Sequence, residues 1–233
     1  MKSPIILAVD TNSLETAKRW IDATREHVEV FKLGLEFYLT YGAEGIRAIT
    51  DEFGVDVFLD LKLHDIPKTV ESATLSVATL NPRFLTVHAS GGSAMVTAAA
   101  TAAPHVAITA VTILTSLSEE ELFRIGFANP ALESAVALAE LATAAGAKAI
   151  VCSPLEIAAI RAVLPPDITI ITPGVRPAGT EGNDDQMRTK TPQSALQDGA
   201  DFVVIGRPIT GAWSSGPVAM ADAARKIFED LSM

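Results

Sequence analysis

The sequence predicts an α/β protein in which eight strand–helix units close into a (β/α)8 barrel, the TIM-barrel architecture. Three observations indicate this fold. Short runs rich in β-forming residues recur along the chain, helix-forming segments separate them, and polar residues follow the runs at equivalent points. The expected strands span residues 5–10, 28–34, 55–63, 84–89, 105–113, 147–152, 167–172 and 202–206.

The segments between these runs are rich in Ala, Leu and Glu, which favour helices. The expected helices span residues 13–26, 36–53, 68–80, 92–103, 131–145, 154–163, 192–199 and 217–231. Strict alternation of strands and helices indicates a parallel sheet. An open, doubly wound sheet is the alternative, but it would need a glycine-rich fingerprint after the first strand. The segment Asp10-Thr11-Asn12-Ser13 contains no glycine, so the closed barrel is favoured.

Composition limits the organisation and the partners of the chain. Its 233 residues are 48% hydrophobic and contain no low-complexity or linker-like segment, which predicts one domain over residues 1–233. The net charge of −10 disfavours nucleic-acid and acidic-membrane partners but allows a local basic pocket. The single cysteine, Cys152, fits a reducing compartment and lies in an apolar run, so we expect an inert core thiol. Without an apolar run of membrane-spanning length or a signal peptide, we expect a cytoplasmic protein.

The most informative segment is Asp-Leu-Lys-Leu-His-Asp-Ile-Pro-Lys at residues 60–68. Side chains alternate along a strand, so Asp60 and Lys62 should share one face at the end of the third strand. Pro67 marks the start of the next helix. Charges on a mostly apolar strand are costly unless they are paired. In isolation, such a pair could serve structure alone.

Polar side chains at the ends of other strands favour a functional site. Active sites of (β/α)8 barrels collect where the strands end. The ends of the remaining strands carry Asp10, Lys32, His88, Thr112, Thr115, Arg176 and Arg207. Two long connections, residues 115–130 and 174–191, follow strands and are expected to lie over this face as lids.

A phosphate site is expected after the last two strands, where such barrels commonly bind phosphate. Gly206 would let the backbone approach a ligand, and Arg207 follows it with a guanidinium group. Arg176 and Gln186, in the long loop after the seventh strand, could close on the same phosphate. We expect no metal, because the histidines lack ligand spacing. Asp10, Asp60 and Asp65 could hold a hard cation, but the interleaved lysines already provide positive charge there.

These residues match a known family. Residues 60–67, Asp-Leu-Lys-Leu-His-Asp-Ile-Pro, resemble the signature of the orotidine 5'-phosphate decarboxylase family. Other segments agree in the same order: Leu7-Ala8-Val9-Asp10, Lys32-Leu33-Gly34, Val87-His88-Ala89-Ser90-Gly91-Gly92, Val111-Thr112-Ile113-Leu114-Thr115-Ser116, Thr172-Pro173-Gly174-Val175-Arg176-Pro177, Asp185-Gln186 and Ile205-Gly206-Arg207-Pro208. The resemblance runs from residue 4 to about residue 231.

The resemblance implies conversion of orotidine 5'-phosphate to UMP and carbon dioxide, the last step of pyrimidine nucleotide synthesis, without metal or organic cofactor. It also implies a homodimer with shared active sites. Lys62 would protonate C6 of the pyrimidine, and Asp60 would sit beside the substrate carboxylate. The other implied roles are ribose binding by Asp10 and Lys32, contributions from the second subunit by Asp65, Ile66 and Thr69, pyrimidine contact by Thr115, and binding at the phosphate side by Arg176, Gln186, Gly206 and Arg207.

Two other functions stay open at this stage. Related barrel lyases, the 3-keto-gulonate phosphate decarboxylases and hexulose phosphate synthases, use magnesium, carry an acid at the position of Lys32 and lack the His-Asp-Ile-Pro turn. A non-catalytic nucleotide-binding barrel would bind UMP without turnover, but it has no need of a proton donor at C6. Fold alone does not separate these functions.

Overall fold

A computed structural model describes residues 3–176 and 190–232 of the chain. Within these residues, eight parallel strands form a closed barrel in sequence order. The strands are β1 (Ile5–Ala8), β2 (Val30–Gly34), β3 (Asp56–Leu63), β4 (Phe84–His88), β5 (Ala107–Val111), β6 (Ala149–Val151), β7 (Thr169–Thr172) and β8 (Phe202–Ile205). Pairing of β8 with β1, Val203 opposite Ile5 and Val204 opposite Ile6, closes the ring. The predicted (β/α)8 barrel is therefore confirmed.

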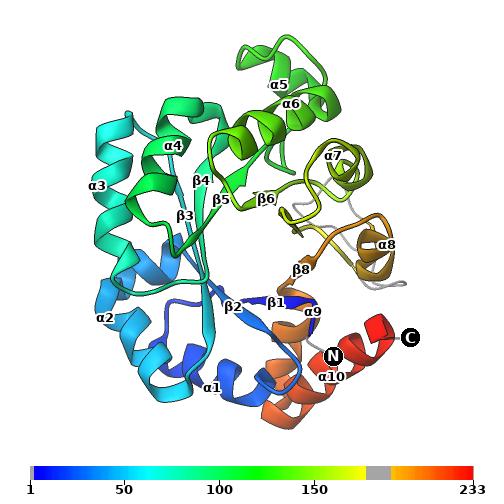
Figure 1. The fold of residues 1–233 in the computed structure, drawn as a ribbon. Coiled ribbons are helices and arrows are strands. Elements are labelled where there is room, and N and C mark those ends of the chain that lie inside the picture. Colours follow the sequence, from blue (N-terminus) through cyan, green and yellow to red (C-terminus); the bar gives the residue numbers. More distant parts are fainter. Residues whose placement is uncertain (1–2, 177–189, 233) are drawn as a thin grey trace.

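Helices follow the strands around the outside of the barrel in chain order (Figure 1). The principal helices are α1 (Leu14–Thr24), α2 (Leu35–Phe53), α3 (Pro67–Ala78), α4 (Ser93–Ala102), α6 (Ala131–Ala144), α7 (Ile157–Val163), α8 (Pro192–Gln197) and α10 (Pro217–Ser232). As predicted, α3 begins at Pro67, where the missing N–H and fixed φ of proline suit the first turn. Contacts between α10 and α1 close the helical layer.

Three connections contain helical turns that the sequence pattern did not predict. The loop after β5 holds α5 (Glu119–Arg124), which begins with a capping box between Ser118 and Glu121. After β8 the chain enters α9 (Arg207–Thr210) and a 3-10 turn, η2 (Gly211–Ser215). A second 3-10 turn, η1 (Ala89–Gly91), follows β4. In the other long connection, Val175 pairs with Lys190, while residues 177–189 lie outside the described part.

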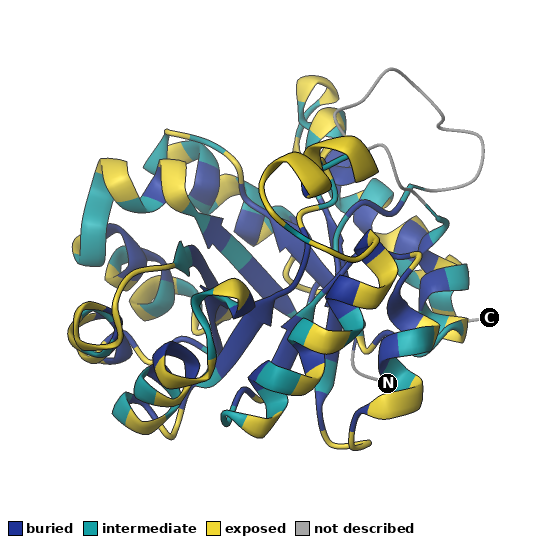
Figure 2. Ribbon diagram, turned by 90° about the horizontal axis from the view of Figure 1, so that it is seen from above, coloured by how far each residue is buried: buried dark blue, intermediate teal, exposed yellow. Residues whose placement is uncertain are grey.

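Buried residues gather in the strands and on the inner faces of the helices (Figure 2). A large cluster fills the space between strands and helices. A smaller cluster contains residues of the barrel strands: Ile6, Ala8, Val30, Phe58, Phe84, Ala149, Ile171 and Val204. The rings of Phe58 and Phe84 meet edge to face, 5.7 Å between centroids. Ala8, Phe58 and Val204 also line the cavity described below, so this cluster forms part of its floor.

Several strands are shorter than predicted. The β-propensity of the residues does not show where hydrogen bonding between strands ends, so the predicted bounds were too wide. The first strand ends at Ala8 rather than at residue 10, so Asp10 lies in the following loop. The fifth covers Ala107–Val111 rather than residues 105–113. None of the helices formed by the described residues is both long enough and apolar enough to span a bilayer.

Candidate active site

A cavity of about 390 Å³ lies at the carboxyl ends of the strands. Eight of the residues singled out from the sequence line it: Asp10, Lys32, Asp60, Lys62, Thr115, Arg176, Gly206 and Arg207. Asp65, Ile66 and Thr69 are exposed, in the turn after β3 and the first turn of α3. Gln186 falls outside the described residues. The structure thus assembles in one place charged side chains from β2, β3 and the loops after β1, β7 and β8.

Strand β3 is irregular where it enters this cavity. Its pairing with β4 shifts between Leu59 and Leu63, and Lys62 has a φ of 49°. A left-handed φ is uncommon for any residue but glycine. The prediction that Asp60 and Lys62 share one face is nevertheless confirmed, because both line the cavity and their side chains are in contact. What the simple alternation did not predict is the irregular backbone at Lys62.

Four charged side chains form a row across the mouth of the barrel, Asp10, Lys32, Asp60 and Lys62. The Lys62 ammonium lies 2.8 Å from each carboxylate oxygen of Asp60. On the other side, Lys32 Nζ is 3.5 Å from Asp60 Oδ2 and 3.1 Å from Asp10 Oδ1. The side chains of Asp60 and Lys32 are only 12% and 13% exposed. Each inner charge therefore has an opposite charge beside it, as burial requires.

The row shifts the pKa values of its two most buried members. Burial alone would raise the pKa of Asp60, but the ammonium groups of Lys32 and Lys62 outweigh it and hold that pKa below its usual value. Burial alone would lower the pKa of Lys32, but the Asp60 and Asp10 carboxylates outweigh it and raise that pKa. Both groups are thus ionised across the neutral pH range.

Sequence reasoning missed Thr86, which is completely buried on β4. Its hydroxyl donates a hydrogen bond to Asp60 Oδ1 at 3.0 Å and accepts one from the main-chain N–H of Lys62 at 2.8 Å. The available signal was its place on β4, two residues before His88 at the strand end. Period-two alternation puts both on the same face of the strand.

Two of the four histidines, His64 and His88, lie beside the row rather than within it. The centroids of the His64 and His88 rings are 5.4 Å apart. Burial lowers the pKa of His88, and the neighbouring His64 and Lys62 lower it further, which favours the neutral ring near pH 7. Among the residues described, no group of three or more His, Cys, Asp or Glu side chains could hold a metal ion. Cys152 is buried at the cavity wall, and burial raises the pKa of its thiol, which disfavours a nucleophilic thiolate.

Two arginines, Arg176 and Arg207, line the cavity from the loops after β7 and β8. Arg176 follows the bridge between Val175 and Lys190, and its main-chain N–H donates to the carbonyl of Lys190 at 3.0 Å. Arg207 is the first residue of α9. At Gly206, an added Cβ would make an ordinary contact of 3.5 Å with Ala8. Packing within the chain therefore gives no reason for glycine here, whereas close approach of a ligand would.

A closed barrel of parallel strands, with a charged cavity at their carboxyl ends, defines a (β/α)8-barrel enzyme. A sequence profile described as "Orotidine 5'-phosphate decarboxylase / HUMPS family" matches residues 3–224. The chain belongs to this family.

Individual relatives agree with the family assignment. The orotidine 5'-phosphate decarboxylase of Thermobifida fusca is 53% identical over 96% of both chains. That of Paramagnetospirillum magneticum is 42% identical over the whole of both. Among solved structures, the orotidine 5'-phosphate decarboxylase of Lactobacillus acidophilus superposes with a TM-score of 0.83 at 34% identity, covering 97% of this chain and 99% of that one.

The electrostatics of the row can be tested by titrating Asp60. We expect its carboxyl group, followed by carbon-13 NMR and assigned with Asp60→Asn, to titrate below 3.8, the ordinary value for Asp. Because the folded pKa lies below the unfolded one, Asp60 stabilises the fold above pH 3.8, and this contribution is lost as the pH falls through the lowered pKa. Lys32→Met should raise the pKa of Asp60. The control is Lys18→Met, which should leave the pKa of Asp60 unchanged, because Lys18 pairs with Glu52 on the surface. An Asp60 pKa above 3.8 in the unmodified protein would contradict this electrostatic account.

Proposed function

We propose that this protein decarboxylates orotidine 5'-phosphate to UMP and carbon dioxide, the last step of de novo pyrimidine nucleotide synthesis, and that it does so in the cytoplasm as one domain without metal or organic cofactor. One observation carries the proposal: the Lys62 ammonium faces the cavity while both oxygens of Asp60 hold it at 2.8 Å. Membership of the family supports the same reaction.

Lys62 is the proposed proton donor. Loss of carbon dioxide from C6 of the pyrimidine leaves an electron pair on that carbon, with no ring carbonyl placed to delocalise it simply. An ammonium group fixed beside C6 stabilises this charge without reorganisation. The same group then delivers its proton to C6, which gives UMP. Lys62 thus first stabilises the carbanion and then protonates it.

Asp60 has two proposed tasks. It orients the Lys62 ammonium, since both of its oxygens contact Nζ. It also compensates the charge of Lys32 on the other side, at 3.5 Å. In this proposal the substrate carboxylate lies beside Asp60 before it leaves as carbon dioxide, so the group that is lost sits next to a fixed negative charge.

The remaining residues bind the substrate away from the reacting carbon. Asp10 and Lys32 are proposed to hold the ribose hydroxyls, and Thr115 to lie near the pyrimidine. Arg176, Gln186, Gly206 and Arg207 are proposed to bind at the phosphate side, with Gln186 bridging to the base. Binding energy from the phosphate then orders the site around C6, so remote contacts contribute to the chemical step.

The site is proposed to be completed by a second copy of the chain. Asp65 and Ile66 belong to the signature motif at residues 60–67, and Thr69 follows it closely. All three residues are exposed in the single chain. The side of the barrel formed by α2 and α3 also exposes apolar residues, with Ile66 66%, Leu39 79% and Leu75 50% exposed. A second cavity of about 260 Å³ opens on this side, beside Lys62 and the start of α2 at Leu35. In a homodimer, a partner loop carrying Asp65, Ile66 and Thr69 fits these features.

The description of the matched family also names a HUMPS branch. We equate this branch with the magnesium-dependent barrel lyases considered in the sequence analysis, and Lys32 favours the decarboxylase over them. The magnesium-dependent relatives carry an acid at this position of the second strand. Here an ammonium group stands between Asp10 and Asp60, at 3.1 and 3.5 Å. It fills the place a cation would take between the two carboxylates.

The proposed reaction can be followed by the change in ultraviolet absorbance as orotidine 5'-phosphate is converted to UMP. We expect turnover by the purified protein, unchanged in excess EDTA, because Lys62 supplies the positive charge at C6. Activity that is lost in EDTA and restored by magnesium would support the HUMPS branch instead. Binding of UMP without any turnover would identify a non-catalytic nucleotide-binding barrel.

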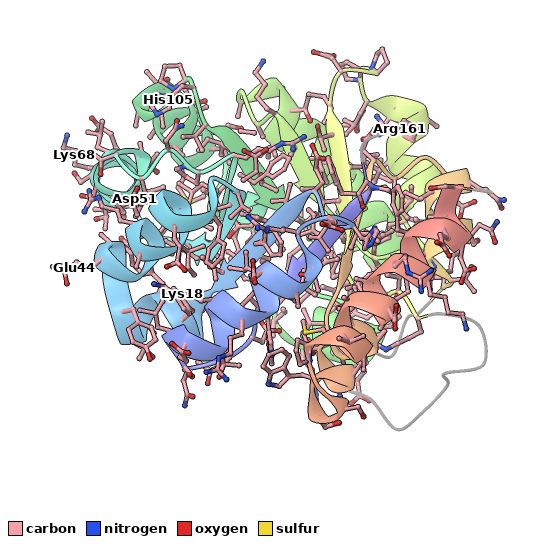
Figure 3. All side chains as sticks on the ribbon, turned by 90° about the horizontal axis from the view of Figure 1, so that it is seen from below. Lys18, Glu44, Asp51, Lys68, His105 and Arg161 are labelled. Atoms are coloured by element: carbon pink, nitrogen blue, oxygen red, sulfur yellow. The ribbon has the colours of Figure 1, made fainter. Side chains whose placement is uncertain are left out.

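Replacing Lys62 separates catalysis from binding. We expect Lys62→Ala to lower kcat by at least about 10³-fold, because both proton donation and charge stabilisation are lost. UMP affinity, measured by calorimetry, should change little, since the phosphate and ribose contacts remain. The matched control is Lys18→Ala on the outer helical layer (Figure 3), where Lys18 pairs with Glu52. Near-normal turnover by Lys62→Ala would refute its role.

Shared sites can be tested by subunit mixing. Lys62→Ala and Asp65→Ala homodimers should both be severely impaired. In their heterodimer, one site carries both defects and the other none, so activity should return to about half that of the unmodified dimer. Mixing Lys62→Ala with Asp60→Ala is the control, because Asp60 and Lys62 contact each other within one chain and no native site forms. If native mass spectrometry shows heterodimers and the first mixture stays inactive, Asp65 does not act across the interface.

A further inference from the structure

We propose that Thr86 is a positioning residue for the reaction, whose hydroxyl holds the Asp60 carboxylate and the main chain of Lys62 in place together. The inference rests on the proposed function, since it assigns Thr86 a role in the same site. Thr86 is completely buried, so it acts on a substrate only through these two neighbours.

One hydroxyl group makes both contacts. Thr86 Oγ1 donates its proton to Asp60 Oδ1 at 3.0 Å, and it accepts the main-chain N–H of Lys62 at 2.8 Å. A hydroxyl is one donor and also an acceptor, so both functions of this group are used. The oxygen of Asp60 that Thr86 contacts also lies 2.8 Å from Lys62 Nζ. Lys62 is therefore held at its backbone directly and at its ammonium group through Asp60.

The hydrogen bond from the Lys62 N–H to Thr86 lies where the pairing of β3 with β4 is interrupted. Pairing between β3 and β4 is interrupted between Leu59 and Leu63, and Lys62 has a φ of 49°. Such backbone conformations persist only when the surroundings hold them. At this break in the ladder, the N–H of Lys62 donates to the Thr86 side chain. Thr86 thus supports the unusual backbone at Lys62, whose side chain contacts Asp60.

The neighbouring strand offers a matched comparison. Thr109 on β5 pairs in register with Thr86 and is also completely buried. Its hydroxyl donates to the carbonyl of Ala107 in its own strand, at 2.9 Å. The two threonines therefore share position, burial and side-chain volume, and they differ in that Thr86 contacts the charged pair.

Steady-state kinetics of Thr86→Val, Thr86→Ser and Thr109→Val test the proposal. Valine preserves shape and removes the hydroxyl. We expect kcat of Thr86→Val to fall by roughly 10- to 100-fold, since misplacing a catalytic group by about 1 Å costs on that order. KM should stay within about threefold, because the binding contacts are elsewhere. Thr86→Ser, which keeps the hydroxyl, should recover most of kcat, and Thr109→Val should match the unmodified protein.

Three outcomes would overturn the proposal: an unchanged kcat in Thr86→Val, a loss that serine does not recover, or an equal loss in Thr109→Val. If Thr86→Val does not fold, Thr86→Ala takes its place in the same comparison. Should the unmodified protein show no decarboxylation, the proposed function fails, and crystal structures of the variants decide the positioning claim. In the Thr86→Val structure, the backbone of Lys62 should then leave the left-handed region or the Asp60 side chain should rotate. If Asp60 and Lys62 keep their positions, Thr86 does not position them.

Discussion

The contact between the Asp60 carboxylate and the Lys62 ammonium, 2.8 Å to each oxygen, is the interaction on which the rest of the site depends. A carboxylate that is only 12% exposed is costly unless its charge is compensated. Lys32 and Thr86 supply the other contacts that Asp60 needs, and Asp10 in turn compensates Lys32. Removing either lysine would leave buried charge unmatched. The contacts of the row therefore depend on one another.

The barrel explains why such a row can exist. Closure of β8 on β1 brings the carboxyl ends of all eight described strands to one rim, above a floor that includes Ala8, Phe58 and Val204. Charges from β2 and β3 meet on one side, and Arg176 and Arg207 reach the same cavity from the other loops. In the proposed function, phosphate binding by these arginines and chemistry at Lys62 take place at different parts of this cavity, as the use of remote binding energy requires.

Much of this arrangement could be predicted from the sequence, because the signals were local. Alternation of strands and helices predicted the barrel, and residues at or just after the strand ends, six of them charged, predicted eight residues of the cavity wall. The irregularity at Lys62 could not be foreseen, because a period of two describes only regular strands. Thr86 was missed because threonine is common in strands and its partners lie on another strand. Ser118 and Glu121 form the capping box of α5, and their spacing is a helix-start signal. Residues 115–130 were nevertheless predicted as a loop, so this helix was missed.

A crystal structure of the protein with UMP bound tests the central claim most directly, that Lys62 is the group that meets the charge at C6. The account predicts C6 of the base within about 3.5 Å of Lys62 Nζ, a distance at which reacting atoms lie in near-attack geometry. It also predicts the phosphate against Arg207, with Asp60 still in contact with Lys62. A base bound with C6 away from Lys62, or a phosphate placed on Lys62 itself, would contradict the account.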